Sequence, residues 1–304
     1  MRRVLLLTLA LLLTVVGVSQ AGAVAAVLGD ATPDRRDVAA APRQADPDAA
    51  QNPCTGAHAD RLACPDLVMR RPFGLRIERS RKGRQLLRAG NSIDNVGDGP
   101  ASLRGGRTTT RGRFMDADQL IRRRGGGTRR VDTPGRLEFK KAHLGLSYWK
   151  FHDAARFELW RLDADGTKTA VARTGPKVSY CLRDLERTRP SLPGSPRRVV
   201  YPACSTNAKR RAVTLGTSVG WSDVYPPAYP EQWIDVTGLK GCFAYVHTAD
   251  PGNALHETNE DNNVSQVVVR LPFRRSSPRG DCPGRQFGLR YDRSKASAWV
   301  AEGW

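Results

Sequence analysis

Short stretches in which apolar and polar residues alternate recur through the middle of the chain. Residues 74–79 (Gly-Leu-Arg-Ile-Glu-Arg) and 156–162 (Arg-Phe-Glu-Leu-Trp-Arg-Leu) show this period of two clearly. Such alternation is typical of β-strands with one buried face. An Asp-Ala-Asp-Gly sequence at 163–166 separates the second stretch from residues 167–171, which predicts a hairpin. Further strands are expected at residues 232–236, 242–248 and 264–271.

The strand candidates are separated by residues that favour turns. Examples are Gly238, Gly241, Pro251-Gly252 and Asn262-Asn263. No segment shows the 3.6-residue apolar period of a convincing amphipathic helix. Many short strands with Gly, Pro and Asn turns predict an all-β fold, an antiparallel β-sandwich with long loops.

The chain begins with the features of a secretory signal peptide. Two arginines precede an apolar run from Val4 to Val18, and an Ala-Gly-Ala site follows at 21–23. Residues 1–23 are therefore expected to be a cleaved signal peptide of a secreted, extracellular protein, with no membrane span after cleavage. A retained N-terminal anchor is the alternative. Residues 24–50 are expected to form a disordered lead, 51–275 the folded domain, and 276–304 a loosely packed basic tail.

Because export is expected, the six cysteines predict disulfides, since an even count in an oxidising compartment is typical of them. No pair has C-x-x-C spacing, which disfavours a zinc ribbon or a thioredoxin-like redox site. Six cysteines allow 15 connectivities. Pairing by neighbourhood predicts Cys54–Cys64, Cys181–Cys204 and Cys242–Cys282.

The formal net charge is +19, and arginine dominates it. The densest basic stretch is residues 104–130, which is interrupted by glycines and is expected to be either a solvated loop or an adhesive surface for anionic cell-wall polymers. It lacks the interleaved aromatic residues of a nucleic-acid stacking surface, so nucleic acid is a disfavoured partner. Anionic cell-wall or extracellular polymers are the expected partners of such a surface.

No familiar catalytic or transition-metal motif is present. The five histidines form neither H-x-H nor H-E-x-x-H, and the chain has no G-x-S-x-G and no P-loop. Three unusual segments stand out: residues 175–181 with a lone lysine, residues 220–227 with aromatic residues and turns, and residues 257–263 with many side-chain oxygens. Their plain interpretations are a surface lysine, a core tyrosine and a polar hairpin loop.

These three segments, in this order, resemble the lysyl oxidase family. The resemblance spans roughly residues 64–272 and is similar to secreted bacterial members. It is carried by the sequences Asp-Leu-Val at 66–68, Asn-Val-Gly-Asp-Gly-Pro at 95–100, Arg-Phe-Glu-Leu at 156–159, Lys-Val-Ser-Tyr-Cys-Leu-Arg-Asp at 177–184, Gln-Trp-Ile-Asp-Val at 232–236 and the segment 257–263.

The resemblance implies a copper-dependent amine oxidase. Members of the family oxidise a primary amine, typically a peptidyl lysine, to an aldehyde. Their organic cofactor is lysine tyrosylquinone, which is formed from a lysine and a tyrosine of the same chain. At the matching positions stand Lys177 and Tyr225, and Tyr229 is a competing choice for the tyrosine.

The family's copper histidines have the form H-x-H-x-H just before the Phe-Glu-Leu strand. The matching run here is Leu-Ser-Tyr-Trp-Lys at 146–150, so each histidine position carries another residue. A shifted register would recruit His143 and His152 instead. Two hypotheses follow: an amine oxidase, or a catalytically inactive, calcium-stabilised β-sandwich that acts as a cell-surface binding or scaffold protein.

The family resemblance also implies a calcium site between the start of the domain and the oxygen-rich segment. Calcium binds 6–8 oxygen ligands, including backbone carbonyls. Glu260 and Asp261 are expected to face solvent, and a polar turn without an ion is the alternative. The implied ligands are Asp66, Leu67 through its carbonyl, Glu257, Asn259, Asn262 and Asn263.

Overall fold

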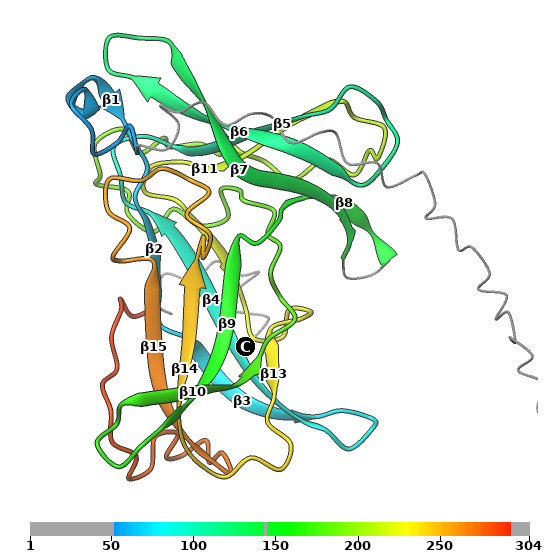
Figure 1. Cartoon of the computed structure of the whole chain (residues 1–304), viewed down its shortest axis with the longest axis vertical. Helices are drawn as coiled ribbons and strands as arrows, with labels where there is room; N and C mark the ends of the chain where they lie inside the picture. The colour runs from blue at the N-terminus through cyan, green and yellow to red at the C-terminus, as the bar shows by residue number, and fades with distance from the viewer. Residues whose placement is uncertain (1–51, 143–144, 293–304) are drawn as a thin grey trace, which may run out of the picture. The chain divides into compact units, whose positions relative to one another are not determined.

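The computed structural model describes residues 52–142 and 145–292 (Figure 1). The predicted signal peptide, the lead and residues 293–304 lie outside the described residues. Within the described ranges the secondary structure is β, apart from one short 3₁₀ turn, η3 (Ala59–Arg61), and every strand pair is antiparallel. No helix in this part of the chain is long and apolar enough to cross a membrane.

Six strands form the sheet drawn in the upper part of Figure 1. Five of them pair in the order β11-β5-β6-β7-β8, and β1 pairs with β6. The strands are β1 (Leu62–Ala63), β5 (Ala101–Gly106), β6 (Phe114–Arg123), β7 (Thr128–Lys141), β8 (Ser147–Phe151) and β11 (Ala212–Thr217).

A second sheet is built around β4 (Gln85–Asn95), an eleven-residue strand that is buried over nearly its whole length. Its N-terminal half pairs with β3 and β13, and its C-terminal half pairs with β2 and β12. The partners are β2 (Leu67–Met69), β3 (Phe73–Arg79), β12 (Ser222–Tyr225) and β13 (Trp233–Asp235).

The third sheet has the order β10-β9-β14-β15 and lies in front of β3 and β4 in Figure 1. One continuous apolar core joins all three sheets, so the burial of apolar surface holds them together. The strands are β9 (Ala155–Leu162), β10 (Lys168–Thr174), β14 (Gly241–Ala249) and β15 (Val264–Leu271). Core side chains include Leu87 and Ile93 of β4, Phe157 of β9, Tyr245 of β14 and Trp149 of β8.

The predicted all-β antiparallel fold is confirmed, and β3, β9, β10, β13, β14 and β15 lie where alternation placed strands. The turn at 163–166 is also confirmed, because the Asp163 carboxylate accepts hydrogen bonds from the backbone N–H groups of Asp165 and Thr167. The expectation of a solvated loop at 104–130 was wrong. Most of that stretch belongs to β5, β6 and β7, because Met115, Ala117 and other alternate residues of β6 face the core.

All three predicted disulfides are present, with Cα–Cα separations of 5.8, 5.8 and 5.4 Å. Cys242–Cys282 ties part of the expected tail to β14. Residues 276–292 are held further by Tyr291, whose ring stacks on Phe73 with 4.3 Å between centroids. The described part of this segment therefore packs against the domain and is not loose.

Candidate functional site

Lys177 lies in the interior, not on the surface where its plain interpretation put it. Its side chain is 1% exposed. The Nζ atom lies 4.3 Å from the ring centroid of Tyr180, 4.4 Å from that of Tyr225 and 4.8 Å from that of Tyr229. These four residues are called the Lys177 cage below.

Backbone bonds from separate elements position the cage. Tyr180 follows Lys177 closely and exchanges two backbone hydrogen bonds with Phe151 at the end of β8. The adjacent Cys181 is fixed by its disulfide to Cys204. Tyr225 ends β12, where it pairs with Asn91 of β4.

Buried polar groups complete the floor of the cage. Gln232 donates from Nε2 to the Asn91 side-chain oxygen at 2.8 Å and to the Tyr180 hydroxyl at 3.4 Å. Asp223, two residues before Tyr225, is fully buried and is hydrogen-bonded to Tyr225. The cage and its floor therefore combine one amine, three phenols and one carboxyl, and all of these residues except Tyr229 are fully buried.

Burial dominates the electrostatics here. The pKa of Lys177 is lowered to about 7, mainly by burial and also by the nearby Lys150. Asp223 and Glu231 oppose this change. Burial also raises the pKa of Asp223 to about 8 against the opposing effects of Arg183 and Lys177. Desolvation raises the pKa of Tyr180 and of Tyr225 as well. The cage thus favours the uncharged forms of its groups.

Strand β8 supplies a second pair of side chains beside the cage. Tyr148 and Lys150 are two residues apart, so they share one face of the strand. The Tyr148 hydroxyl lies 2.8 Å from the Tyr229 hydroxyl, and Lys150 Nζ lies 4.8 Å from the Tyr148 ring centroid. Lys150 is 3% exposed.

A pocket of about 430 Å³ adjoins these side chains. The charged residues of its lining are three lysines and one glutamate, and Lys140 Nζ lies 3.7 Å from the Glu231 carboxylate. Lys177 is not part of the lining. The lining residues are Lys140, Lys141, Ala142, Lys150, Tyr229, Pro230 and Glu231.

The family model described as lysyl oxidase matches residues 127–277, a segment that contains the whole cage. The chain belongs to the lysyl oxidase family. A comparison with curated proteins gives no match.

In this lysyl oxidase family member, the structure brings together the two residues proposed for the family's quinone, Lys177 and Tyr225. Tyr229, the competing tyrosine, is only slightly farther from Lys177 Nζ. Sequence reasoning did not assign site roles to Tyr180, Asp223 and Gln232. The family motifs contain Tyr180 and Gln232, but only the fold shows that Tyr180 belongs to the cage and that Gln232 is hydrogen-bonded to it.

The family's copper ion would need imidazole ligands, which Cu(II) favours. Within residues 52–142 and 145–292 no group of three His, Cys, Asp or Glu side chains could hold a metal ion. His152 Nδ1 lies 3.2 Å from the Glu138 carboxylate and its Nε2 lies 3.5 Å from that of Asp153. His143, the other histidine of the shifted register, lies outside the described residues. The side chains of β8 beside the cage, a phenol and an ammonium group, do not fit copper.

Most of the residues implied for calcium lie close together. Asn262 Nδ2 donates to the Asp66 carboxylate at 2.7 Å, and Asn263 Nδ2 donates to the Glu257 carboxylate at 3.0 Å. The backbone N–H of Leu67 also donates to Glu257, which is fully buried. Burial is the largest cause that raises the pKa of Asp66 and Glu257.

Two details of this acidic cluster differ from expectation. Asn259 is exposed, and its side-chain oxygen accepts a hydrogen bond from the Asp261 N–H. Glu260 is half-buried, although it was expected to face solvent, because the Glu257 N–H and Asn263 Nδ2 both donate to its carboxylate. The tight turn of the segment thus draws Glu260 inward.

Proposed function

We propose that this member of the lysyl oxidase family is a secreted, copper-free β-sandwich that acts as an extracellular binding or scaffold protein. The observation that carries the proposal is the pair Tyr148 and Lys150 on β8 beside the Lys177 cage. These residues stand where the family resemblance places copper histidines. A phenol and a lysine side chain replace the imidazole ligands that Cu(II) favours, so copper binding is disfavoured.

A second candidate function rests on the 4.4 Å distance between Lys177 Nζ and the Tyr225 ring centroid. In the family, such a pair gives lysine tyrosylquinone, which oxidises peptidyl lysine or other primary amines to aldehydes. The pair would fit that organic cofactor. The absence of imidazole from the neighbouring face of β8 favours the copper-free function, with Lys177 and Tyr225 retained as unmodified core residues.

The deciding experiment uses full-length protein secreted in medium that contains copper. We expect no stoichiometric copper, no quinone staining, and no peroxide release from primary amines. Peptide mass analysis should recover Lys177 and Tyr225 as separate, unmodified residues. Copper near one equivalent, together with quinone absorption that is lost in Lys177→Arg, would establish the amine oxidase instead.

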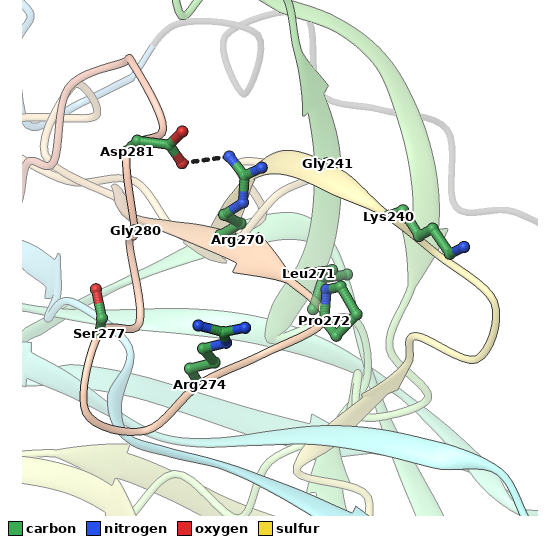
Figure 2. Close-up of a pocket in the computed structure, with 9 residues that line it drawn as sticks. All are labelled: Lys240, Gly241, Arg270, Leu271, Pro272, Arg274, Ser277, Gly280 and Asp281. Atoms are coloured by element: carbon green, nitrogen blue, oxygen red, sulfur yellow. Dashed lines mark hydrogen bonds and ion pairs between the residues drawn. The ribbon is translucent and has the colours of Figure 1, made fainter.

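The expected partners are anionic cell-wall or extracellular polymers, in keeping with the +19 charge. A basic pocket of about 590 Å³ supports this part of the proposal (Figure 2). Lys240, Arg270 and Arg274 line it, and Asp281, its one acidic residue, pairs with Arg270. The Cys242–Cys282 disulfide anchors the wall that carries Asp281.

Binding to immobilised dextran sulfate, with neutral dextran as the control, tests this partner class. We expect retention that falls steeply with salt, because the contacts are ionic. Arg274→Gln should weaken retention, whereas Lys168→Gln on exposed β10 serves as a charge-matched control outside the pocket. Equal losses in both variants would assign binding to general charge and not to this pocket.

Calcium is the third part of the proposal. Burial raises the pKa values of the Asp66 and Glu257 carboxyls, and a bound cation would favour their charged forms. The oxygens of Leu67, Asn262 and Asn263 would supplement the ligand set, and the exposed Asn259 would need to turn inward. The ion would join β2 to the segment before β15.

A further inference from the structure

The pocket beside the Lys177 cage differs from what a lysine substrate requires. Lys140, Lys141 and Lys150 face one carboxylate, Glu231, and Lys140 is already paired with it. A cationic amine would meet like charge in this pocket. The lining suits a ligand that carries a negative charge.

Lys150 is the most enclosed basic group of this pocket. Its side chain is 3% exposed, yet it belongs to the lining. No carboxylate of the described residues lies within ion-pair distance of its Nζ, and its neighbours are the Tyr148 ring and the charges of Glu231, Lys140 and Glu138. Burial lowers the pKa of Lys150, and Lys140 adds to that effect. A desolvated lysine beside another cation is the usual arrangement of an amine nucleophile.

We infer that Lys150 captures small carbonyl compounds bearing a carboxylate, such as oxoacids, as a reversible Schiff base. This inference rests on the proposed copper-free state, because a metal ion at β8 would occupy the same place. Lys141 and Lys140 would hold the ligand's carboxylate, and Tyr229 forms part of the same pocket wall.

The reaction needs no oxidant. The uncharged Lys150 amine adds to the carbonyl carbon, so a C–N bond forms and the carbonyl oxygen becomes a hydroxyl group after proton transfer. Loss of that hydroxyl as water leaves the C=N bond. Amine and carbonyl thus give imine and water, with no change of oxidation state, and hydrolysis restores both.

The test is reductive trapping on the full-length wild-type protein with glyoxylate and cyanoborohydride at pH 7. Each trapped lysine gains a carboxymethyl group, which peptide mass analysis locates. The exposed lysines Lys168 and Lys240 are internal controls in the same digest. We expect Lys150 to react faster than either, because burial lowers the pKa of Lys150 and leaves a larger fraction of it as free amine at pH 7.

Two further arms keep the inference falsifiable. Lys141→Ala should slow trapping of glyoxylate at Lys150 by several fold but leave trapping of uncharged propanal unchanged. Labelling of Lys150 no faster than that of Lys168, or labelling of Lys177 in its place, would overturn the inference. Copper analysis of the same sample separates the two ideas: copper at one equivalent refutes the proposed function, whereas absence of both copper and labelling refutes only this inference.

Discussion

At the residue scale, the structure explains how a lysine can remain in an apolar core. A buried ammonium ion is costly, and burial here lowers the pKa of Lys177 to about 7, while three aromatic rings contact its amine. The family resemblance singled out Lys177 and Tyr225. Their approach could not be read from spacing, because separate loops and strands bring the two residues together.

Lys177 should make stability depend on alkaline pH. Its pKa falls from 10.5 to about 7 on folding, so the unfolded chain binds more protons between these values. Stability from this group therefore rises with pH across that window, by at most about 1.4 kcal/mol per pH unit. Asp223 has the opposite effect, but only below about pH 8. Its carboxyl keeps its proton in the folded state up to that pH, so its contribution to stability falls as the pH rises toward 8. Urea unfolding between pH 8 and 10 should show a steeper rise for wild type than for Lys177→Met; equal slopes would contradict the buried, unmodified amine.

His247 should make the stability of the fold depend on pH in the acidic range. It is fully buried between Phe157 and Tyr245, neither ring nitrogen has a hydrogen-bond partner among the described residues, and burial lowers its pKa to about 3. The unfolded chain takes up a proton near pH 6.5, so the stability present above that pH is lost as the pH falls toward 3. We expect His247→Phe to have a higher Tm than wild type, with the difference widening from pH 7 to pH 4. A constant difference would show that protonation of His247 is not involved.

At the element scale, the alternation of apolar and polar residues predicted the strands that have one solvent-exposed face. It failed for β4, which is buried on both faces and therefore has no alternating pattern. It also failed for β6 and β7, whose many arginines suggested a loop. Arginine can keep its charged end in water while its backbone stays in the sheet, so charge density alone does not exclude a strand.

The turn after β4 depends on glycine because the chains approach closely there. A Cβ atom on Gly99 would overlap the Ala63 backbone, and the Gly99 N–H donates to the Cys64 carbonyl at 2.8 Å. We expect Gly99→Ala to lower the free energy of unfolding by about 1–3 kcal/mol through overpacking. Gly106→Ala at the end of β5 is the matched control, because a Cβ there meets nothing within 4 Å. Similar unfolding curves for both variants would show that the contact is relaxed without cost.

At the scale of the whole molecule, the candidate sites join segments far apart in sequence. The acidic cluster links Asp66, just before β2, to Glu257, Glu260 and Asn262 before β15. Neighbourhood pairing predicted the disulfides because each joins nearby parts of the chain. The partners in the acidic cluster came instead from the resemblance, and Glu260 was missed because its inward position depends on hydrogen bonds within the folded turn.

Calcium should stabilise the whole domain if this cluster binds it, because an ion that binds only the folded state raises stability by mass action. In metal-free protein at pH 8, we expect millimolar calcium to raise the Tm and Glu257→Gln to abolish the rise. Asp261→Asn is the matched control, since Asp261 is exposed in the same segment. The raised pKa values of Asp66, Glu257 and Glu260 mean that calcium must displace protons, so the rise should shrink at pH 5. A Tm that is unchanged by calcium at pH 8, or an equal loss of the effect in Asp261→Asn, would leave the cluster as a hydrogen-bonded turn that needs no ion.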